Sequence, residues 1–328
     1  MQYRRLGGSG LKLSALSLGS WLTAGVRLGR GGMRELVALA WDHGINFFDS
    51  AENYAHGEAE RVLGDVLTDL RLPRDGFCVS SKVLFGSVPD PRPTQAGLSR
   101  KHVRDACHDA LRRLRVDYLD LFFCHRPDPE TPVAETVRAM DDLVRQGKVL
   151  YWGTSEWPAS LIREAFEIAR AHHLAPPTTE QPQYNLLHRE RVELEYAALY
   201  AECGLGATVW SPLAYGLLSG KYDDGVPEGS RLSQPGVPGR LDRPGGQARL
   251  ERARRFSAAA AELGVAPAPL AIAWCLSNPH VSSVILGASQ PAQLLENLGA
   301  LELADRFDDT VWRRLECVVD QGRGSPGG

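Results

Sequence analysis

The sequence lacks the marks of an exported, membrane-spanning or metal-binding protein. Its 328 residues hold only six cysteines, with no CxxC pair and no HExxH motif, which argues against a disulfide framework and against a zinc site. No apolar run approaches the roughly 20 residues that a membrane-spanning helix needs. The N-terminus is not followed by the apolar core of a signal peptide. We therefore expect a cytoplasmic protein with no metal site.

An excess of charge of one sign is also lacking. The formal net charge is -3, and this near balance gives no electrostatic reason to expect nucleic acid or an anionic membrane as a partner. Hydrophobic residues make up 43% of the chain and charged residues 23%, as in ordinary globular proteins. These values favour a folded protein whose partner is a small molecule.

What the sequence does contain is a regular alternation of apolar, β-rich runs and helical patterns. Residues 4–13 predict a hairpin with a glycine-rich turn. Eight strands are expected after it, over residues 16–21, 45–49, 78–83, 118–125, 149–155, 178–184, 207–213 and 283–288. Helical periodicity lies between and after them, over residues 33–42, 57–67, 99–114, 131–147, 159–171, 190–202, 248–263, 268–276, 290–301 and 309–319.

Strict alternation of strand and helix predicts an α/β protein with a parallel sheet. Eight such units in one chain fit a closed (β/α)8 TIM barrel with an N-terminal β-hairpin and additional C-terminal helices, as a single domain over residues 1–328. The alternative is two doubly wound domains divided near Pro176-Pro177. No glycine fingerprint follows a predicted strand, which disfavours that alternative. The one GxGxxG, at residues 322–327, has no helix after it and belongs to an expected flexible tail over residues 321–328.

The predicted strands end in polar side chains of a chemically selective kind. Asp49, Lys82 and His125 end three strands, and Tyr54 lies on the loop after Asp49. In an α/β barrel the carboxyl ends of the strands face one pocket, so we expect these side chains to meet. Each also has a purely structural explanation, because Asp49 could cap a helix, Lys82 could extend to solvent and His125 could be an ordinary buried histidine. Four such coincidences at neighbouring strand ends are less probable than one.

These four residue types suit the reduction of a carbonyl group. A phenol has a pKa near 10, which makes it a poor proton donor at neutral pH, and a nearby ammonium lowers that pKa. Lys82 can serve as the ammonium, and Asp49 can hold it in place and charged. A carbonyl oxygen that gains negative charge would then find a proton donor in Tyr54 and a hydrogen-bond partner in His125. The hydride would come from a cofactor.

Motifs along nearly the whole chain strengthen this hypothesis, and with them the chain resembles the aldo-keto reductase family. The similarity runs from Tyr3 to about Ala300 and is greatest to the branch that contains the voltage-gated potassium channel beta subunits and their bacterial relatives. The motifs are Phe48-Asp49-Ser50-Ala51-Glu52-x-Tyr54, Gly57-x-Ala59-Glu60, Ser81-Lys82, His125-Arg126-Pro127-Asp128, Gly153-Thr154-Ser155-Glu156-Trp157, Glu180-Gln181-Pro182-Gln183-Tyr184-Asn185, Trp210-Ser211-Pro212-Leu213-Ala214, Gly220-Lys221-Tyr222, Gly287-Ala288-Ser289 and Gln293-Leu294-x-Glu296-Asn297.

The resemblance implies an NADPH-dependent reductase whose catalytic residues are Asp49, Tyr54, Lys82 and His125. It implies that Ser155 and Gln181 hold the nicotinamide carboxamide, that Trp210 stacks on the nicotinamide, and that Lys221 and Arg231 meet the phosphates. The other cofactor-binding residues that it implies are Ser20, Trp21, Arg27, Asp49, Glu156, Ser211, Pro212, Leu213, Ala214, Gly287, Ser289, Gln293, Glu296 and Asn297. Arginine suits phosphate because its guanidinium offers a fork of donors.

The segment over residues 223–247 is rich in proline and glycine and has no apolar period. It is too long to be a mere connector in a compact domain. Our hypothesis is a mobile loop that folds over bound NADPH and is tethered through Arg231. The alternative is a disordered insertion with no role.

Two residues depart from the pattern of the channel subunits. His125 stands where those subunits carry asparagine, which favours turnover, and Glu156 stands where they carry a basic residue beside the cofactor. The leading hypothesis is an NADPH-dependent aldehyde or ketone reductase. One alternative is a cofactor-sensing regulatory subunit with slow turnover, and a weaker one is a barrel isomerase that acts on sugars. The resemblance leaves the substrate open and allows a homo-oligomer, and the expected pocket wall consists of Trp21, Tyr54, Phe85, Trp157 and Arg126.

Overall fold

The computed structural model describes residues 1–21, 28–233 and 241–321. These residues fall into two compact units. Unit 1 comprises Met1–Pro182, Arg191–Val209 and His280–Leu294, and unit 2 comprises Gln183–Glu190, Trp210–Pro279 and Leu295–Gly328. The expectation of a single domain over residues 1–328 stays a prediction.

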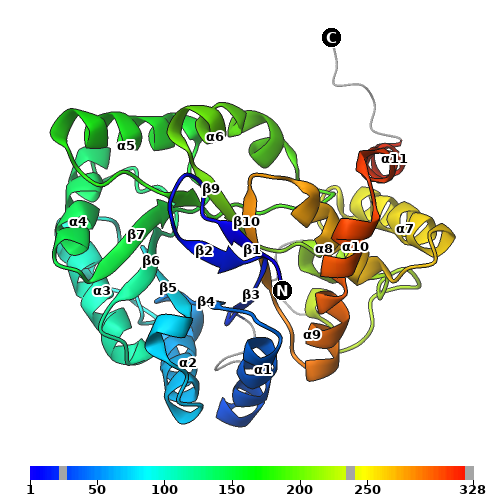
Figure 1. The fold of residues 1–328 in the computed structure, drawn as a ribbon, viewed down its shortest axis with the longest axis horizontal. Helices are drawn as coiled ribbons and strands as arrows, with labels where there is room; N and C mark the ends of the chain where they lie inside the picture. Colours follow the sequence, from blue (N-terminus) through cyan, green and yellow to red (C-terminus); the bar gives the residue numbers. More distant parts are fainter. Residues whose placement is uncertain (22–27, 234–240, 322–328) are drawn as a thin grey trace. The chain divides into compact units, whose positions relative to one another are not determined.

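Unit 1 contains a closed barrel of eight parallel strands, and this confirms the predicted (β/α)8 fold (Figure 1). The strands are hydrogen-bonded in the order β10, β3, β4, β5, β6, β7, β8 and β9. Their bounds are β3 (Leu16–Gly19), β4 (Phe47–Asp49), β5 (Cys78–Val83), β6 (Leu119–Cys124), β7 (Val149–Thr154), β8 (Thr179–Glu180), β9 (Gly206–Val209) and β10 (Val281–Leu286). Except for Leu150 and Tyr151 of β7, the residues of these strands are buried on both faces, which is why most of the strands appear in the sequence as largely apolar runs.

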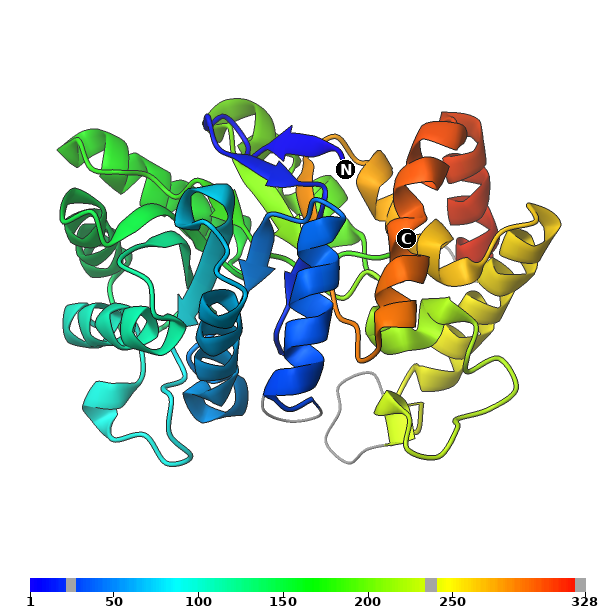
Figure 2. The same cartoon turned by 60° about the horizontal axis from the view of Figure 1, so that its bottom comes forward.

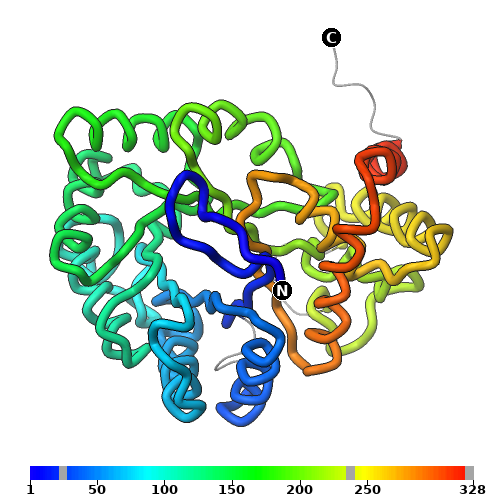
Figure 3. Tube along the Cα trace, viewed as in Figure 1, coloured from blue at the N-terminus to red at the C-terminus, as the bar shows by residue number. Residues whose placement is uncertain are grey.

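Helices that follow the strands lie outside the barrel, as the tube in Figure 3 also shows. Their apolar residues recur at helical spacing and face inward, as Val137 and Met140 do on α4. The helices are α1 (Arg30–Asp42), α2 (Glu58–Asp69), α3 (Arg100–Leu114), α4 (Val133–Arg145), α5 (Ala159–His172) and α6 (Ala197–Cys203).

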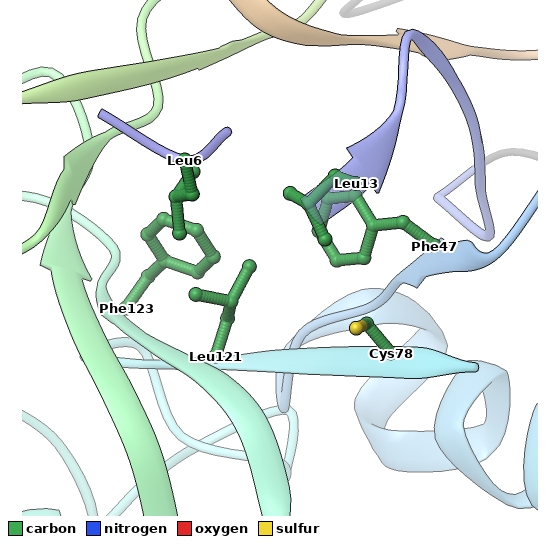
Figure 4. Packing of buried hydrophobic residues seen from close by; sticks show 6 residues of the cluster. All are labelled: Leu6, Leu13, Phe47, Cys78, Leu121 and Phe123. Atoms are coloured by element: carbon green, nitrogen blue, oxygen red, sulfur yellow. The ribbon is translucent and has the colours of Figure 1, made fainter. Parts of the chain in front are cut away.

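The expected N-terminal hairpin is present, and Figure 2 shows it at one end of the barrel strands. β1 (Tyr3–Arg5) pairs antiparallel with β2 (Lys12–Ser14). Leu6 and Leu13 of this hairpin pack on apolar side chains of the barrel interior, and all of them are at most 7% exposed (Figure 4). Each large apolar side chain buried in this way contributes about 1.5–3 kcal/mol. The partners are Phe47, Cys78, Leu121 and Phe123. The hairpin therefore closes the amino-terminal end of the barrel and leaves the carboxyl end for a site.

Two glycines allow the hairpin turn to sit on the connection between α6 and β9. The amide of Gly8 donates to the carbonyl oxygen of Gly204 at 2.8 Å. A Cβ atom on Gly7 would lie only 2.3 Å from that same oxygen, and Gly7 has a φ of 53°. A larger residue at position 7 would therefore push the hairpin away from the barrel.

Unit 2 consists mainly of helices, as expected for the C-terminal part of the chain. Arginines of α7 fasten the C-terminal helix: Arg252 donates to Asp320 at 2.7 Å, and Arg255 donates to the carbonyl oxygen of Val318 at 3.0 Å. The helices are η5 (Ala214–Ser219), η6 (Arg231–Ser233), α7 (Gly246–Glu262), α8 (Pro267–Ser277), α10 (Ala300–Arg306) and α11 (Asp309–Asp320). α9 (Pro291–Leu298) begins in unit 1 and ends in unit 2.

Four expected elements differ clearly from the structure. The strand over 207–213 is reduced to β9, which ends at Val209, before Pro212. The strand over 178–184 is reduced to β8, because Pro182 has no N–H for a ladder hydrogen bond. The helix over 190–202 is divided into a π-helical turn, Arg191–Glu195, and α6. The helix over 290–301 breaks between Leu298 and Ala300, at Gly299, a residue with a low helix propensity.

Among the described residues, no single helix is long and apolar enough to cross a membrane. Only when α7 and α8 are taken together, as a pair bent by 97°, do length and composition reach those of a membrane span.

Candidate active site

The carboxyl ends of β4, β5 and β6 carry polar side chains on the inner face of the barrel. Residues two or four apart on a strand share a face. On each of these strands an apolar residue of the cluster beneath the hairpin is followed at such a spacing by a polar one. The pairs are Phe47 and Asp49, Cys78 and Lys82, and Phe123 and His125. The alternation that closes one end of the barrel therefore places these polar side chains at the other end.

Asp49 and Lys82 form a buried ion pair with several further hydrogen bonds. Nζ of Lys82 donates to Oδ2 of Asp49 at 2.6 Å and to the carbonyl oxygen of Ser50 at 2.7 Å. Oδ1 of Asp49 accepts from Oγ of Ser80 at 2.7 Å and from Nε2 of Gln181 at 3.0 Å. Both ionic side chains are almost fully buried. The carboxylate is therefore fixed on both oxygens, and it fixes the ammonium.

Tyr54 stands beside this ion pair at the start of η1 (Tyr54–Gly57). Its hydroxyl oxygen lies 3.4 Å from Nζ of Lys82, a long hydrogen bond. Its ring lies edge to face with the ring of His125 at a centroid distance of 5.8 Å, and 6.3 Å from the ring of Trp21. The structure therefore brings Asp49, Tyr54, Lys82 and His125 together, as the sequence predicted.

Burial sets the direction of the tyrosine pKa. It raises the pKa of the Tyr54 hydroxyl above 10.0, and the Lys82 ammonium lowers it by less than burial raises it. The effect of Lys82 thus has the sign expected from the sequence, but the net direction is opposite to that expectation. In Lys82, burial lowers the pKa of the ammonium, and the Asp49 carboxylate and the Tyr54 hydroxyl raise it by more. Tyr54 is therefore a neutral phenol and Lys82 a cation at neutral pH.

The backbone directly after Tyr54 is held in a left-handed conformation. The φ angles are 48° at Ala55, 54° at His56 and 85° at Gly57. A non-glycine residue held there costs of order 1–3 kcal/mol, and such residues persist where the surrounding fold determines them. The turn that presents Tyr54 is therefore a strained one, set by the fold.

His125 is 7% exposed and electrically neutral. Burial lowers its pKa well below 6.5, and the positive charges of Lys82 and Arg126 add to this effect. In the described chain its buried Nδ1 has no hydrogen-bond partner. A proton on Nδ1 would therefore have no acceptor, which favours the tautomer that carries the proton on Nε2. The ring of Phe85 lies edge to face with the imidazole at 5.2 Å.

Arg126 and Ser155 continue the row of polar residues along the strand ends. Nη1 of Arg126 donates to Oγ of Ser155 at 3.1 Å and to the carbonyl oxygen of His125. Oγ of Ser155 donates to the carbonyl oxygen of Gln181 at 2.8 Å. The residues that follow β6, β7 and β8 are therefore hydrogen-bonded to one another, and through Gln181 to Asp49.

The remaining cofactor residues predicted for unit 1 lie at strand ends or on α9. Oγ of Ser20 donates to Oγ of Ser50 at 2.9 Å. Glu156 accepts from Arg191 at 3.0 Å, so its charge is already paired. Beyond β10 and Gly287, the amide and the hydroxyl of Ser289 both donate to Oε1 of Gln293, at 2.8 and 3.1 Å.

Most of the cofactor residues predicted for unit 2 lie in or beside a turn that follows Trp210. Nδ2 of Asn185 donates to the carbonyl oxygen of Ser211 at 2.9 Å. The φ angles are 57° at Ser211, 47° at Ala214 and 60° at Tyr215. The guanidinium of Arg231 lies 4.7 Å from the centroid of the Tyr215 ring. The turn also contains Pro212 and Leu213. The last two predicted residues lie on α9, where Glu296 is exposed and Asn297 is buried.

The residues around this turn fit the phosphates of a dinucleotide. The amides of Ala214 and Tyr215 donate within the turn, to the carbonyl oxygen and Oγ of Ser211 at 3.0 and 3.1 Å, so the fit to an anion depends on the cations beside the turn. Lys221 is exposed, and no carboxylate of the described chain pairs with it. Together with Arg231 it supplies the positive charge that such an anion needs.

Some predictions fall outside the described residues. Arg27 is one of these, as are residues 234–240 of the expected lid over 223–247 and most of the expected tail over 321–328. The lid and the tail stay predictions. The meeting of the unit 1 and unit 2 cofactor residues also stays a prediction.

Two residues that contribute to the site were missed. Ser80 holds Oδ1 of Asp49, and its position two residues before Lys82 on the same strand was the signal that could have found it. Glu52 accepts from the backbone amides of Leu84 and Gly86, at 2.7 and 2.9 Å, and so holds the loop that carries Phe85. Glu52 belongs to a quoted motif, but a carboxylate buried for its backbone contacts cannot be distinguished by sequence from an exposed one.

Comparison with known proteins gives matches over nearly the whole chain. The profile described as "Aldo/keto reductase family" matches residues 15–320. A "Probable voltage-gated potassium channel subunit beta" of Oryza sativa subsp. japonica is 45% identical over 320 residues, which cover 97% of this chain and 97% of that protein. A protein of the same name from Arabidopsis thaliana is 43% identical over 320 residues, with the same two coverages. A "Putative voltage-gated potassium channel subunit beta" of Schizosaccharomyces pombe is 43% identical over 321 residues, which cover 97% of this chain and 93% of that protein.

Proposed function

The chain belongs to the aldo/keto reductase family, and on this basis we propose that it reduces an aldehyde or a ketone to an alcohol. Members of this family are NADP-dependent oxidoreductases, and this chain is one of them. The proposal names Tyr54 as the general acid, assisted by Lys82, Asp49 and His125. The observation that carries it is the position of Nζ of Lys82, which contacts Asp49 at 2.6 Å and the hydroxyl of Tyr54 at 3.4 Å.

Tyr54 supplies the proton in this proposal. Its hydroxyl is a neutral phenol, so it can donate to the carbonyl oxygen as that oxygen gains negative charge. The phenolate that remains is stabilised by the ammonium of Lys82, whose own charge is held by Asp49. Solvent returns a proton to Tyr54 after the alcohol has formed.

His125 orients the carbonyl group. With its proton on Nε2, the neutral imidazole can donate a hydrogen bond to the carbonyl oxygen without giving up the proton. Because burial and two nearby cations keep its pKa well below 6.5, it does not compete with Tyr54 as the acid. Phe85, which is 45% exposed, and Trp21, which is 39% exposed, offer apolar surface beside the imidazole and the phenol.

When bound, NADPH supplies the hydride that reduces the carbonyl carbon. We expect Ser155 and Gln181 to hold its carboxamide and Trp210 to lie against the nicotinamide. Lys221 and Arg231 would bind its phosphates, and the other contacts are those predicted from the sequence. The two cations beside the turn of unit 2 support this assignment, because Lys221 lies next to Gly216 and Arg231 lies over the ring of Tyr215.

A regulatory role with slow turnover is the second candidate, because the relatives are named as subunits of potassium channels. The presence of all four proposed catalytic residues, Asp49, Tyr54, Lys82 and His125, favours the enzyme, since a sensor needs cofactor binding but no proton donor. We propose a small carbonyl compound as the substrate. The homo-oligomer and the cytoplasmic location stay predictions.

The test is a titration of the purified protein with NADPH and, separately, with NADH, followed by protein fluorescence. A panel of aldehydes is then added to the saturated complex, and the oxidation of NADPH is measured. Tight NADPH binding with oxidation supports the reductase. Tight binding without oxidation favours the regulatory candidate, and binding of neither nucleotide contradicts both.

A further inference from the structure

Arg126 is a cation beside the proposed reaction centre, and the ligand for it remains to be assigned. We propose that Arg126 binds an anionic oxyacid group of the substrate, a carboxylate or a phosphate, so that the preferred substrates are small aldehydes that carry such a group a few bonds from the carbonyl. This inference rests on the proposed reductase function and names the class of its substrate.

The position of the guanidinium is fixed by two strand ends. Arg126 directly follows His125, and its Nη1 donates both to the carbonyl oxygen of that residue and to Oγ of Ser155, at 3.1 Å in the second case. Its side chain is therefore held across the ends of β6 and β7. Its positive charge lies close enough to lower the pKa of both Tyr54 and His125.

Arg126 has no carboxylate partner, which is also true of the half-buried Arg138 and Arg255 of the described chain, although their hydrogen bonds go to backbone carbonyls and a histidine. No carboxylate of the described chain lies within 4.0 Å of it. By contrast, five other arginines with limited exposure each pair with an acid at 3.0 Å or less. These pairs are Arg74 with Asp120, Arg113 with Glu60, Arg189 with Asp320, Arg191 with Glu156, and Arg252 with Asp320.

The nearest acid in the sequence cannot serve Arg126, because its oxygens are used elsewhere. Asp128 accepts from the amides of Leu98 and Glu130, at 2.8 and 3.0 Å, and from the hydroxyl of Thr131 at 2.6 Å. A partly desolvated guanidinium without an anion is unfavourable, and an anionic ligand relieves that cost.

The free donors of Arg126 can receive such a ligand. A guanidinium has five N–H donors in a planar fork, and hydrogen bonds of this side chain occupy Nη1 alone. Nε and Nη2 make no hydrogen bond within the described chain, and neither belongs to its buried nitrogens without a partner. Both nitrogens are therefore accessible to an approaching group. The fork matches the two oxygens of a carboxylate or a phosphate. Phe85 and Trp21 would contact the carbon chain between the carbonyl and the anion.

The experiment compares charged and neutral aldehydes of matched size. Succinic semialdehyde is paired with butanal, and glyceraldehyde 3-phosphate with glyceraldehyde, so that carboxylate and phosphate are tested separately. For each pair, kcat/KM is measured with NADPH for the wild type, Arg126→Gln and Arg126→Lys. We expect the wild type to favour one charged aldehyde or both, and Arg126→Gln to lower the charged-to-neutral ratio about 10- to 100-fold. Arg126→Lys keeps the charge without the fork and should give an intermediate ratio.

Arg163→Gln is the matched control, because this exposed arginine of α5 pairs with Glu202 and lies on a helix outside the barrel. It should leave the ratio unchanged. A ratio that Arg126→Gln does not alter would overturn the proposal. A loss of NADPH affinity in that variant equal to its loss of turnover would also overturn it and would assign Arg126 to the cofactor.

A second measurement is independent of turnover. Calorimetry of succinate and of inorganic phosphate binding to the NADP+ complex should detect one anion or both in the wild type, and Arg126→Gln should abolish that binding. If the wild type reduces neutral aldehydes but neither binds these anions nor favours charged substrates, Arg126 is not an anion site although the enzyme is a reductase. If it binds the anions but reduces no aldehyde, the proposed function fails and the anion site stands.

Discussion

Lys82 and Asp49 form an ion pair inside the barrel, with Nζ of Lys82 2.6 Å from Oδ2 of Asp49 and side-chain exposures of 0% and 4%. A buried charge is tolerated when it is paired, and it becomes costly when its partner is removed. The pair therefore links the chemistry of the site to the stability of the barrel.

We expect Lys82→Met to destabilise the protein by about 3–5 kcal/mol, because it leaves the carboxylate of Asp49 buried without a counterion. Adding Asp49→Asn to this variant should restore part of the loss, since the charge is then gone. The free energy of unfolding is measured by urea denaturation. The exposed pair Arg163 and Glu202 provides the control, and Arg163→Met should not change stability measurably. If the double variant were no more stable than Lys82→Met, the pairing would not explain the loss.

Tyr54→Phe should remove carbonyl reduction and leave NADPH binding nearly intact. The substitution deletes only the hydroxyl that lies beside Lys82, and removal of a positioned general acid costs about 100- to 10,000-fold in rate. The measurements are kcat/KM on a neutral aldehyde and the Kd of NADPH from fluorescence. Tyr118→Phe, just before β6, is the matched control and should behave as the wild type. Equal losses of turnover and of NADPH binding in Tyr54→Phe would mean that Tyr54 has a structural role.

The sequence predicted the barrel and the meeting of Asp49, Lys82 and His125 because both depend on local patterns. An apolar residue and a polar one at even spacing on a strand share a face, and parallel strands bring their carboxyl ends together. Tyr54 followed from its place in a motif. None of these inferences needed a distance between residues far apart in the chain.

What the sequence could not predict depends on such distances. The hydrogen bond from Gln181 to Asp49 joins residues 132 positions apart, and the balance between burial and Lys82 in the pKa of Tyr54 requires knowledge of how deeply the phenol is enclosed. The bond between Arg126 and Ser155 is of the same kind. Local sequence patterns predicted which residues form the site, but the hydrogen bonds between those residues depend on the closed barrel.

Arg231→Ala should weaken NADPH binding about tenfold or more and NADH binding much less. The guanidinium lies over the ring of Tyr215, at 4.7 Å, and a rigid fork of donors suits the 2′-phosphate that only NADPH carries. The two Kd values are compared by fluorescence titration. Arg314→Ala, an exposed arginine of α11 paired with Glu262, is the control and should alter neither Kd. Equal weakening of both nucleotides would exclude Arg231 as the 2′-phosphate ligand.

Glu180 predicts a pH dependence of stability that can be measured without any ligand. It is fully buried on β8, where Oε1 accepts from the amide of Trp157 at 3.3 Å and Oε2 accepts from the hydroxyl of Thr154. Burial raises the pKa of this carboxyl from 4.5 to about 8, the Thr154 hydroxyl opposes that shift, and the charge of Glu156 adds to it. Between these two pH values the folded protein holds a proton that the unfolded chain has lost, so this group makes the fold less stable as the pH rises.

Glu180→Gln should remove this dependence, because glutamine keeps an oxygen acceptor and cannot ionise. The difference in the free energy of unfolding, wild type minus variant, should fall from pH 5 to pH 8 by at most about 1.4 kcal/mol per pH unit. Urea denaturation at a series of pH values measures it. Glu202→Gln, at an exposed position of α6, is the control and should follow the wild type. A difference that stays constant over this range would show that Glu180 is ionised in the folded protein, and its contacts with Trp157 and Thr154 would then stabilise a buried carboxylate.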